Sequence, residues 1–111
     1  MIFGTPADKV ERFFAKHGRA WLVLPDGWYG RPFDSLFALT LVKDFPDGLY
    51  IELEGDRKLS FQGSMVVKRS HYDKYPSLAI SGFESVLWVP NSGVSKEHAY
   101  RNDGSVVFIS M

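Results

Sequence analysis

The strongest constraint on the fold is the alternation of apolar and polar side chains over residues 49–54. Leu49, Ile51 and Leu53 occupy every second position, and a tyrosine and two glutamates alternate with them. Successive side chains of a β-strand point to opposite faces, so this segment predicts a strand with one buried face. Turn sequences at 45–48 (Phe-Pro-Asp-Gly) and 55–58 (Gly-Asp-Arg-Lys) flank it. Short turns of this kind join neighbouring antiparallel strands and predict a meander.

Other alternating or β-branched segments extend this meander in both directions. Strands are predicted over 20–24, 36–44, 59–68 with a bulge or sharp bend at Gly63, 77–81, 86–89 and 105–109. A short strand at 98–101 is a further candidate, paired with 105–109 through a turn at 102–104, and residues 70–76 are predicted as a loop. Residues 105–109 are apolar on both faces, so we expect an internal strand, covered by barrel closure or by a second copy of the chain.

A single helix is predicted ahead of the first strand. Thr5 suits the N-cap, Pro6 suits the first helical position, and Gly18 is a natural end. The apolar positions recur at the helical period: Val10, Phe13, Phe14 and His17. We expect this stripe to lie on the sheet, with a partner protein as the alternative cover. The fold class is therefore mainly β, a curved antiparallel sheet or small barrel of about seven strands with one N-terminal helix packed on it.

Length and charge restrict the class of protein. The 111 residues suit one domain, 1–111, and Lys plus Arg equal Asp plus Glu at 13 each. Proteins that bind duplex DNA usually carry a basic excess, so this balance argues against one. The absence of cysteine excludes disulfides, zinc–thiolate sites and cysteine nucleophiles. No signal peptide or membrane span is recognisable, so we expect a soluble, cytoplasmic protein with no membrane partner.

The leading candidate site is an aromatic loop at residues 25–34. Pro-Asp-Gly at 25–27 is turn chemistry, and the residue before a proline favours an extended backbone. Trp28 and Tyr29 would supply aromatic walls, Arg31 would meet a carboxylate or phosphate with its planar donor fork, and Asp34 would orient that arginine. In the alternative interpretation the aromatic rings cover one end of a barrel while Arg31 pairs with an aspartate of its own loop.

A second group of candidates lies at 68–75, where basic and aromatic residues alternate. Its members are Arg69, His71, Tyr72 and Asp73. With Arg57 and Lys58 this segment could grip single-stranded nucleic acid, although the neutral net charge disfavours a nucleic-acid partner. His71 and Asp73 could instead belong to a cryptic hydrolase-type enzyme or, with His98, to a metal site. No nucleophile elbow, phosphate loop, dinucleotide fingerprint or paired-histidine motif is present, so we predict no catalytic residue, no metal and no cofactor.

The stretch 24–34 (Leu-Pro-Asp-Gly-Trp-Tyr-Gly-Arg-Pro-Phe-Asp) resembles a loop pattern of small uncharacterised bacterial proteins, and this resemblance implies no activity. A helix followed by a meander also resembles the small Sm-like barrels, a likeness of architecture alone. The sequence therefore favours a small non-catalytic binding or interaction module over an enzyme. Its expected partner is another protein, for example a toxin that it neutralises, or a second copy of itself.

Overall fold

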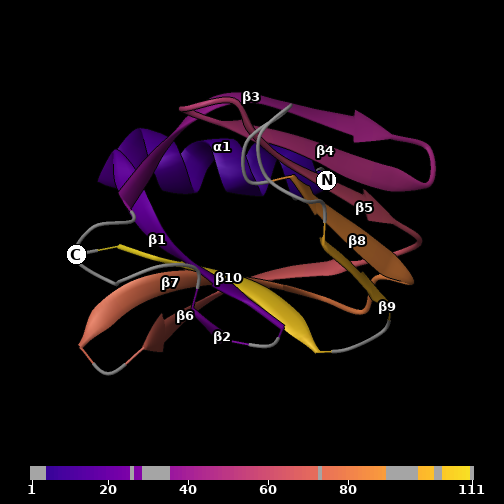
Figure 1. The fold of residues 1–111 in the computed structure, drawn as a ribbon. Coiled ribbons are helices and arrows are strands. Elements are labelled where there is room, and N and C mark those ends of the chain that lie inside the picture. The colour runs from indigo at the N-terminus through magenta and orange to yellow at the C-terminus, as the bar shows by residue number, and fades with distance from the viewer. Residues whose placement is uncertain are drawn as a thin grey trace.

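The computed structural model describes residues 5–25, 27–28, 36–72, 74–89, 98–101 and 104–110. Within these ranges the chain forms the helix α1 (Pro6–His17) and ten strands (Figure 1). The strands are β1 (Arg19–Leu24), β2 (Gly27–Trp28), β3 (Leu36–Phe45), β4 (Gly48–Leu53), β5 (Arg57–Gln62), β6 (Val66–Tyr72), β7 (Tyr75–Ser81), β8 (Ser85–Val89), β9 (His98–Arg101) and β10 (Ser105–Ile109). Among the described residues, no helix has the length and apolar character needed to cross a lipid bilayer.

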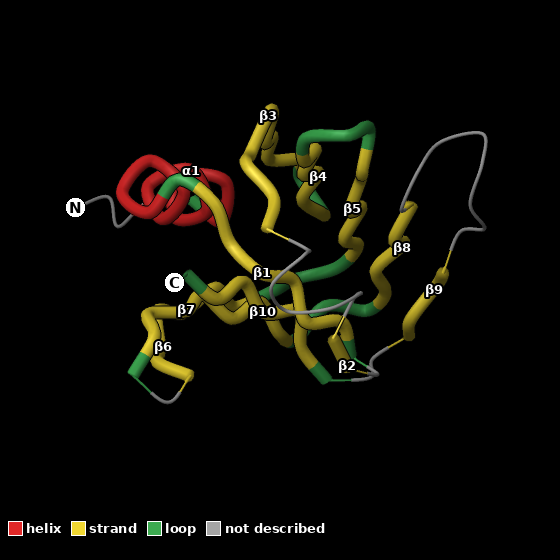
Figure 2. Tube along the Cα trace, turned by 60° about the vertical axis from the view of Figure 1, so that its left-hand side comes forward, coloured by secondary structure: helices red, strands yellow, loops and turns green. Residues whose placement is uncertain are grey.

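All strands join one antiparallel sheet in the order β6-β7-β10-β1-β3-β4-β5-β8-β9, with β2 paired to β1. The sheet folds over on itself, so that β3, β4 and β5 form one layer and β1, β10, β7 and β6 the other (Figures 1 and 2). The mainly β, curved antiparallel prediction is confirmed. The described strands do not close a barrel, because β6 and β9 end the order without pairing to each other, and they number ten rather than about seven.

Three local predictions are wrong, and the first of them adds one strand to the count, as does the unpredicted strand β2. Residues 59–68 are two strands, since β5 pairs with β8 whereas β6 pairs with β7. Residues 70–76 are mostly strand, because β6 and β7 form a tight hairpin up to the pair Tyr72 and Tyr75. The strand at 98–101 pairs with β8 and not with β10. The last strand, β10, lies between β7 and β1, so its predicted internal position is confirmed.

The helix begins and ends where the sequence predicts. Thr5 is the N-cap, its hydroxyl accepts a hydrogen bond from the Asp8 amide at 3.2 Å, and the Asp8 carboxylate accepts one from the Thr5 amide. Asp44 of β3 accepts a further hydrogen bond from the Ala7 amide at 2.9 Å. Pro6 has no amide hydrogen, so the three free amides of the first turn, those of Thr5, Ala7 and Asp8, are all satisfied by side chains, one of them from the sheet.

The buried core fills the space between the two layers and beneath α1. Its fully buried members come from both layers: Leu22, Ile51, Leu59, Ile80, Trp88 and Phe108. From the helix, Val10, Phe13 and Phe14 are buried, and the Phe14 ring meets the Phe108 ring edge-on at 5.2 Å. The predicted apolar stripe therefore lies within this chain, where α1 packs against β3 and β6.

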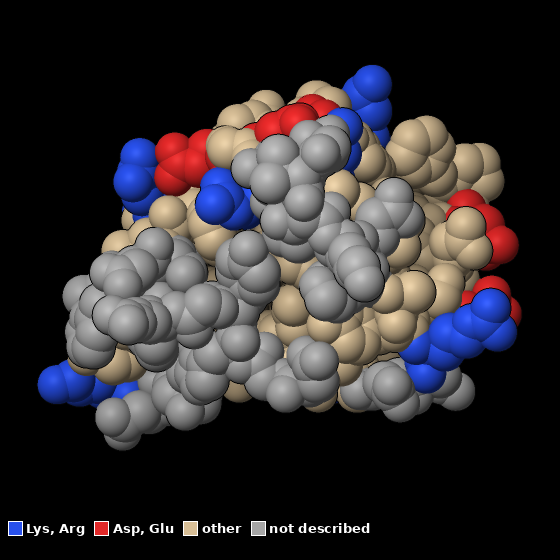
Figure 3. Space-filling model, viewed as in Figure 1, with Lys and Arg blue, Asp and Glu red and all other residues tan. Residues whose placement is uncertain are grey.

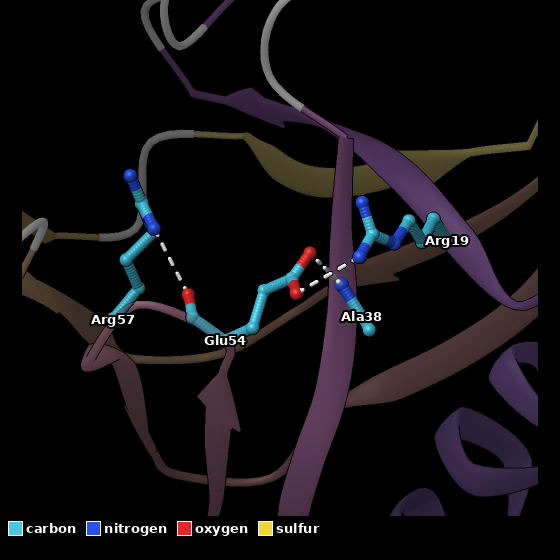
Figure 4. Close-up of polar contacts among 4 residues, drawn as sticks. All are labelled: Arg19, Ala38, Glu54 and Arg57. Atoms are coloured by element: carbon cyan, nitrogen blue, oxygen red, sulfur yellow. Dashed lines mark hydrogen bonds and ion pairs between the residues drawn. The ribbon is translucent and has the colours of Figure 1, made fainter.

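Strand β3 carries the fold from one layer to the other. Residues 36–38 pair with β1, and the residues from Leu39 onward pair with β4, with a shift of register between Leu39 and Leu41. At the crossing, the Ala38 amide donates to the Glu54 carboxylate at 3.1 Å, and the Ala38 carbonyl accepts from the Glu54 amide at 2.9 Å. Glu54 follows the last residue of β4, so it takes the place of a strand partner for Ala38 (Figure 4).

Two arginines hold Glu54 in this position. Arg19 of β1 donates to the same carboxylate at 3.2 Å, and Arg57 of β5 donates to the Glu54 carbonyl at 2.9 Å (Figure 4). The Arg57 guanidinium also lies over the Phe37 ring, 4.5 Å from its centroid. The turn between β4 and β5 needs a positive φ of 78° at Gly55, which glycine adopts without the steric cost of a side chain. Glu54 thus connects β1, β3 and β5 at the fold of the sheet.

This arrangement predicts that Glu54→Ala destabilises the protein by about 1–3 kcal/mol, because the partly buried Ala38 amide loses its acceptor. Glu54→Gln keeps an acceptor oxygen and should lose less, since only the ion pair with the largely exposed Arg19 is removed. The measurement is the unfolding free energy in urea. Equal losses for the two variants would contradict the role given to the hydrogen bond.

Candidate anion-binding cleft

The predicted aromatic site lies mostly outside the described residues. Trp28 belongs to β2, where its backbone pairs with Val23 of β1, and Gly27 pairs with Leu24. Tyr29, Arg31 and Asp34 fall in the part that the structure does not describe. The binding role of this loop therefore stays a prediction.

The second group of candidates lies on strand β6. Arg69 and His71 are exposed and share one face of the strand with Val67, because they follow it at every second position. Tyr72 ends the strand, where its backbone pairs with Tyr75, and Asp73 is outside the described residues. Arg69 lines a cleft together with residues of the helix.

Arg57 and Lys58 do not join Arg69 in one surface. They lie on β5, and β7, β10, β1, β3 and β4 separate β5 from β6 in the sheet order. Both also have contacts of their own. Arg57 binds the Glu54 carbonyl and covers Phe37, and the Lys58 ammonium lies 3.8 Å from the Asp56 carboxylate. The cations predicted to grip nucleic acid together are thus dispersed.

A cleft of about 350 Å³ lies between α1 and the end of the sheet formed by β6 and β7. Figure 2 shows the helix and these two strands on the same side of the molecule. The residues that line the cleft are Lys9, Arg12, Phe13, Lys16 and His17 of α1, Val67 and Arg69 of β6, and Leu78 of β7. The helical members recur at three- and four-residue spacing and form one face, and Leu78 is the register partner of Arg69.

The floor of the cleft is apolar and its rim is positively charged. The floor consists of the buried side chains of Phe13, Val67 and Leu78. The rim carries four exposed cations: Lys9, Arg12, Lys16 and Arg69. None of the described residues that line the cleft is a carboxylate, and the ion pairs Arg19–Glu54 and Lys58–Asp56 involve none of the four cations.

This clustering departs from the charge pattern of the face drawn in Figure 3. On the face drawn in Figure 3, Lys and Arg lie beside Asp and Glu along the upper and right-hand edges. The net charge of the whole chain is zero, so the excess at the cleft arises from the distribution of charge and not from composition.

His17 reports the positive potential of the cleft. Its ring packs on Phe13, with centroids 4.7 Å apart. Burial lowers the pKa of His17, and the nearby charges of Lys16 and Arg69 lower it further. A like charge disfavours the protonated ring, so a helical residue and a strand residue act on the same imidazole.

Guanidinium and ammonium groups around an apolar floor can hold an anion. Arginine binds carboxylate or phosphate with two parallel hydrogen bonds, and lysine acts as a point charge. One of the four cations is partly engaged, because the Lys9 ammonium donates to the Val67 carbonyl at 3.4 Å and ties the helix to β6. The described part of the chain holds no group of three or more His, Asp or Glu side chains suited to a metal ion.

The helical half of this cleft was missed in the sequence, although a signal was present. Lys9, Arg12 and Lys16 follow one another at helical spacing beside the apolar stripe, and only the stripe was interpreted. No protein-family model matches the chain, and no curated protein or solved structure is significantly similar to it. The resemblance of residues 24–34 to a bacterial loop pattern therefore stays a prediction.

The electrostatics of the cleft predict that Arg69→Gln raises the pKa of His17, which NMR titration of the imidazole measures. In the folded chain the His17 imidazole is protonated at lower pH than in the unfolded chain, where its pKa has the reference value of 6.5. The unfolding free energy therefore rises with pH up to the reference value, and this rise should shrink in the variant.

The matched control is Lys68→Gln. Lys68 precedes Arg69 on the same strand, is also exposed, and points to the opposite face. It should leave the pKa of His17 nearly unchanged. Equal rises in the two variants would indicate a general change of net charge and not a local cleft.

Proposed function

We propose that the protein is a non-catalytic binding module that holds an anionic group of its partner in the cleft between α1 and β6. The observation that carries this proposal is the set of four rim cations around a buried apolar floor with no carboxylate among the lining residues. A cluster of like charges repels itself, and a bound ligand of opposite charge would offset this repulsion.

The affinity expected of such a cleft is moderate. A hydrogen bond to a charged group contributes about 1.5–3 kcal/mol. Two or three of them contribute about 3–9 kcal/mol, which corresponds to a Kd between about 6 mM and 0.3 µM. The apolar floor adds contact area for an aliphatic or aromatic part of the same ligand. This range suits a reversible interaction with a protein partner.

The aromatic loop remains a second surface of the same module. Trp28, Tyr29, Arg31 and Asp34 would extend the contact with a partner, as the sequence favours. The alternatives carry less support. A nucleic-acid grip loses Arg57 and Lys58 to contacts within the chain, and a hydrolase centred on His71 lacks a cleft, because His71 is exposed and does not line the one described here.

The proposal predicts that a compact polyanion binds at the cleft. Inorganic tripolyphosphate, added to the protein labelled with nitrogen-15, should shift the amide resonances of α1 and β6, and higher salt should weaken its binding. Arg12→Glu and Arg69→Glu should each reduce affinity at least about tenfold, the loss of one charge-assisted contact.

Lys68→Glu is the control, since it makes the same change of net charge on the other face of β6. It should reduce affinity much less than Arg69→Glu. Shifts spread evenly over all lysine-bearing strands, or equal losses for the Lys68 and Arg69 variants, would contradict a cleft-specific site.

A further inference from the structure

Strand β6 is the end of the sheet. Within the described residues it pairs with β7 alone, and its seven residues, Val66–Tyr72, are in continuous register with no bulge. The strand contains no proline. An open edge of this length offers unpaired backbone groups to another strand, and natural proteins usually shorten, bulge or cover such an edge.

The backbone phase of β6 follows from two contacts. The Val67 carbonyl accepts a hydrogen bond from the Lys9 ammonium of the helix, as expected of a carbonyl that points away from β7. Pro76 of β7 is the register partner of His71. The Pro76 carbonyl accepts a hydrogen bond from the Ser110 amide, on the side of β7 away from β6, and proline has no amide hydrogen to donate to β6. Pairs in an antiparallel ladder alternate between bonded and non-bonded. Val67, Arg69 and His71 are therefore in the non-bonded phase, with their amides and carbonyls directed away from β7. The Val67 carbonyl is occupied by Lys9, and the carbonyls of Arg69 and His71 face the open edge.

The side chains of the same three residues face the cleft side. A strand added antiparallel along β6 would place its residues opposite Val67, Arg69 and His71 on that face too, beside the rim cations of α1. Alternating acidic residues would then bring carboxylates to the cleft while their backbone groups bond to the edge. The open edge and the positive rim thus select the same ligand.

A second copy of the chain does not meet this requirement. Two β6 strands paired about their centres would place the Arg69 side chains of the two copies opposite each other, and opposed like charges destabilise a strand pair. Lysine on an edge strand is also a common device against self-pairing. Charge complementarity therefore points to an acidic segment of a different protein.

We propose that the partner supplies an extended acidic segment that joins the sheet antiparallel to β6 and places alternate carboxylates in the cleft. This inference rests on the proposed function, because it uses the same cations. It adds a hydrogen-bonding requirement that an anion held by charge alone does not have.

The test uses three capped peptides as long as β6, each of alternating glutamate and valine. One is unmodified, one is N-methylated at its glutamates, and one is N-methylated at its valines. In the proposed register the glutamate amides donate to β6 and the valine amides point away. The unmodified and valine-methylated peptides should bind with similar affinity. N-methylation of the glutamate backbone amides should weaken binding by at least about tenfold.

Hydrogen exchange gives a second readout on the protein itself. The unmodified peptide should slow exchange of the Arg69 and His71 amides, which face the open edge. It should leave the Lys68 and Ser70 amides nearly unchanged, because these already face β7.

The outcomes separate the two proposals. Equal binding of all three peptides, or loss on valine methylation alone, overturns strand addition and leaves the anion cleft standing. Binding of tripolyphosphate without binding of the unmodified peptide has the same meaning. Failure of both tripolyphosphate and peptide overturns the proposed function together with the inference.

Discussion

The fold depends on the satisfaction of one backbone position, Ala38, at which β3 leaves the first layer of the sheet for the second. Beyond the end of β4, its amide and carbonyl would lack a strand partner, and unpaired backbone groups that are removed from water are costly. The Glu54 carboxylate and amide occupy both groups. The fold of the sheet at β3 is therefore compatible with a complete set of hydrogen bonds at this position.

The folded-over sheet in turn positions the helix. Asp44, near the end of β3, holds the first turn of α1 through the Ala7 amide, and Phe14 packs on Phe108 in the middle of the opposite layer. Lys9 then reaches Val67 on the edge strand. These contacts fix the angle at which the helix faces β6, so the cations of its exposed face meet Arg69 across a shared apolar floor. The cleft is a consequence of the way the sheet folds over, since the layer that holds β3 and the layer that holds β6 must both reach one helix.

Local patterns in the sequence predicted much of this fold. The alternation at 49–54, the capped helix and the doubly apolar strand at 105–109 are all found in the structure, because each is decided by neighbours a few residues away. The failures concern pairing at long range. Gly63 was interpreted as a bulge or sharp bend after which the meander continues, whereas the chain passes there from β5 to a distant edge strand. The polar composition of 70–76 concealed a hairpin, since the sequence of an edge strand need not show alternating apolar and polar residues.

The candidate site was predictable only in halves. The spacing of Lys9, Arg12 and Lys16 is visible in the sequence, and Arg69 was identified for other reasons. Nothing local relates them, because the hydrogen bond between Lys9 and Val67 joins positions 58 residues apart. The contributions of Arg69 and Leu78 to one cleft likewise became recognisable only from the register of β6 and β7.

The most direct measurement of the central claim is the pKa of His17 with and without saturating tripolyphosphate, followed by NMR on the imidazole. His17 lies inside the cleft and already responds to Lys16 and Arg69, which lower its pKa together with burial. An anion held between α1 and β6 places negative charge beside the ring and favours its protonated form, so the account predicts a rise in this pKa on binding. A tripolyphosphate complex in which the pKa of His17 stays at its free value would contradict it, because the anion would then be bound elsewhere on the protein.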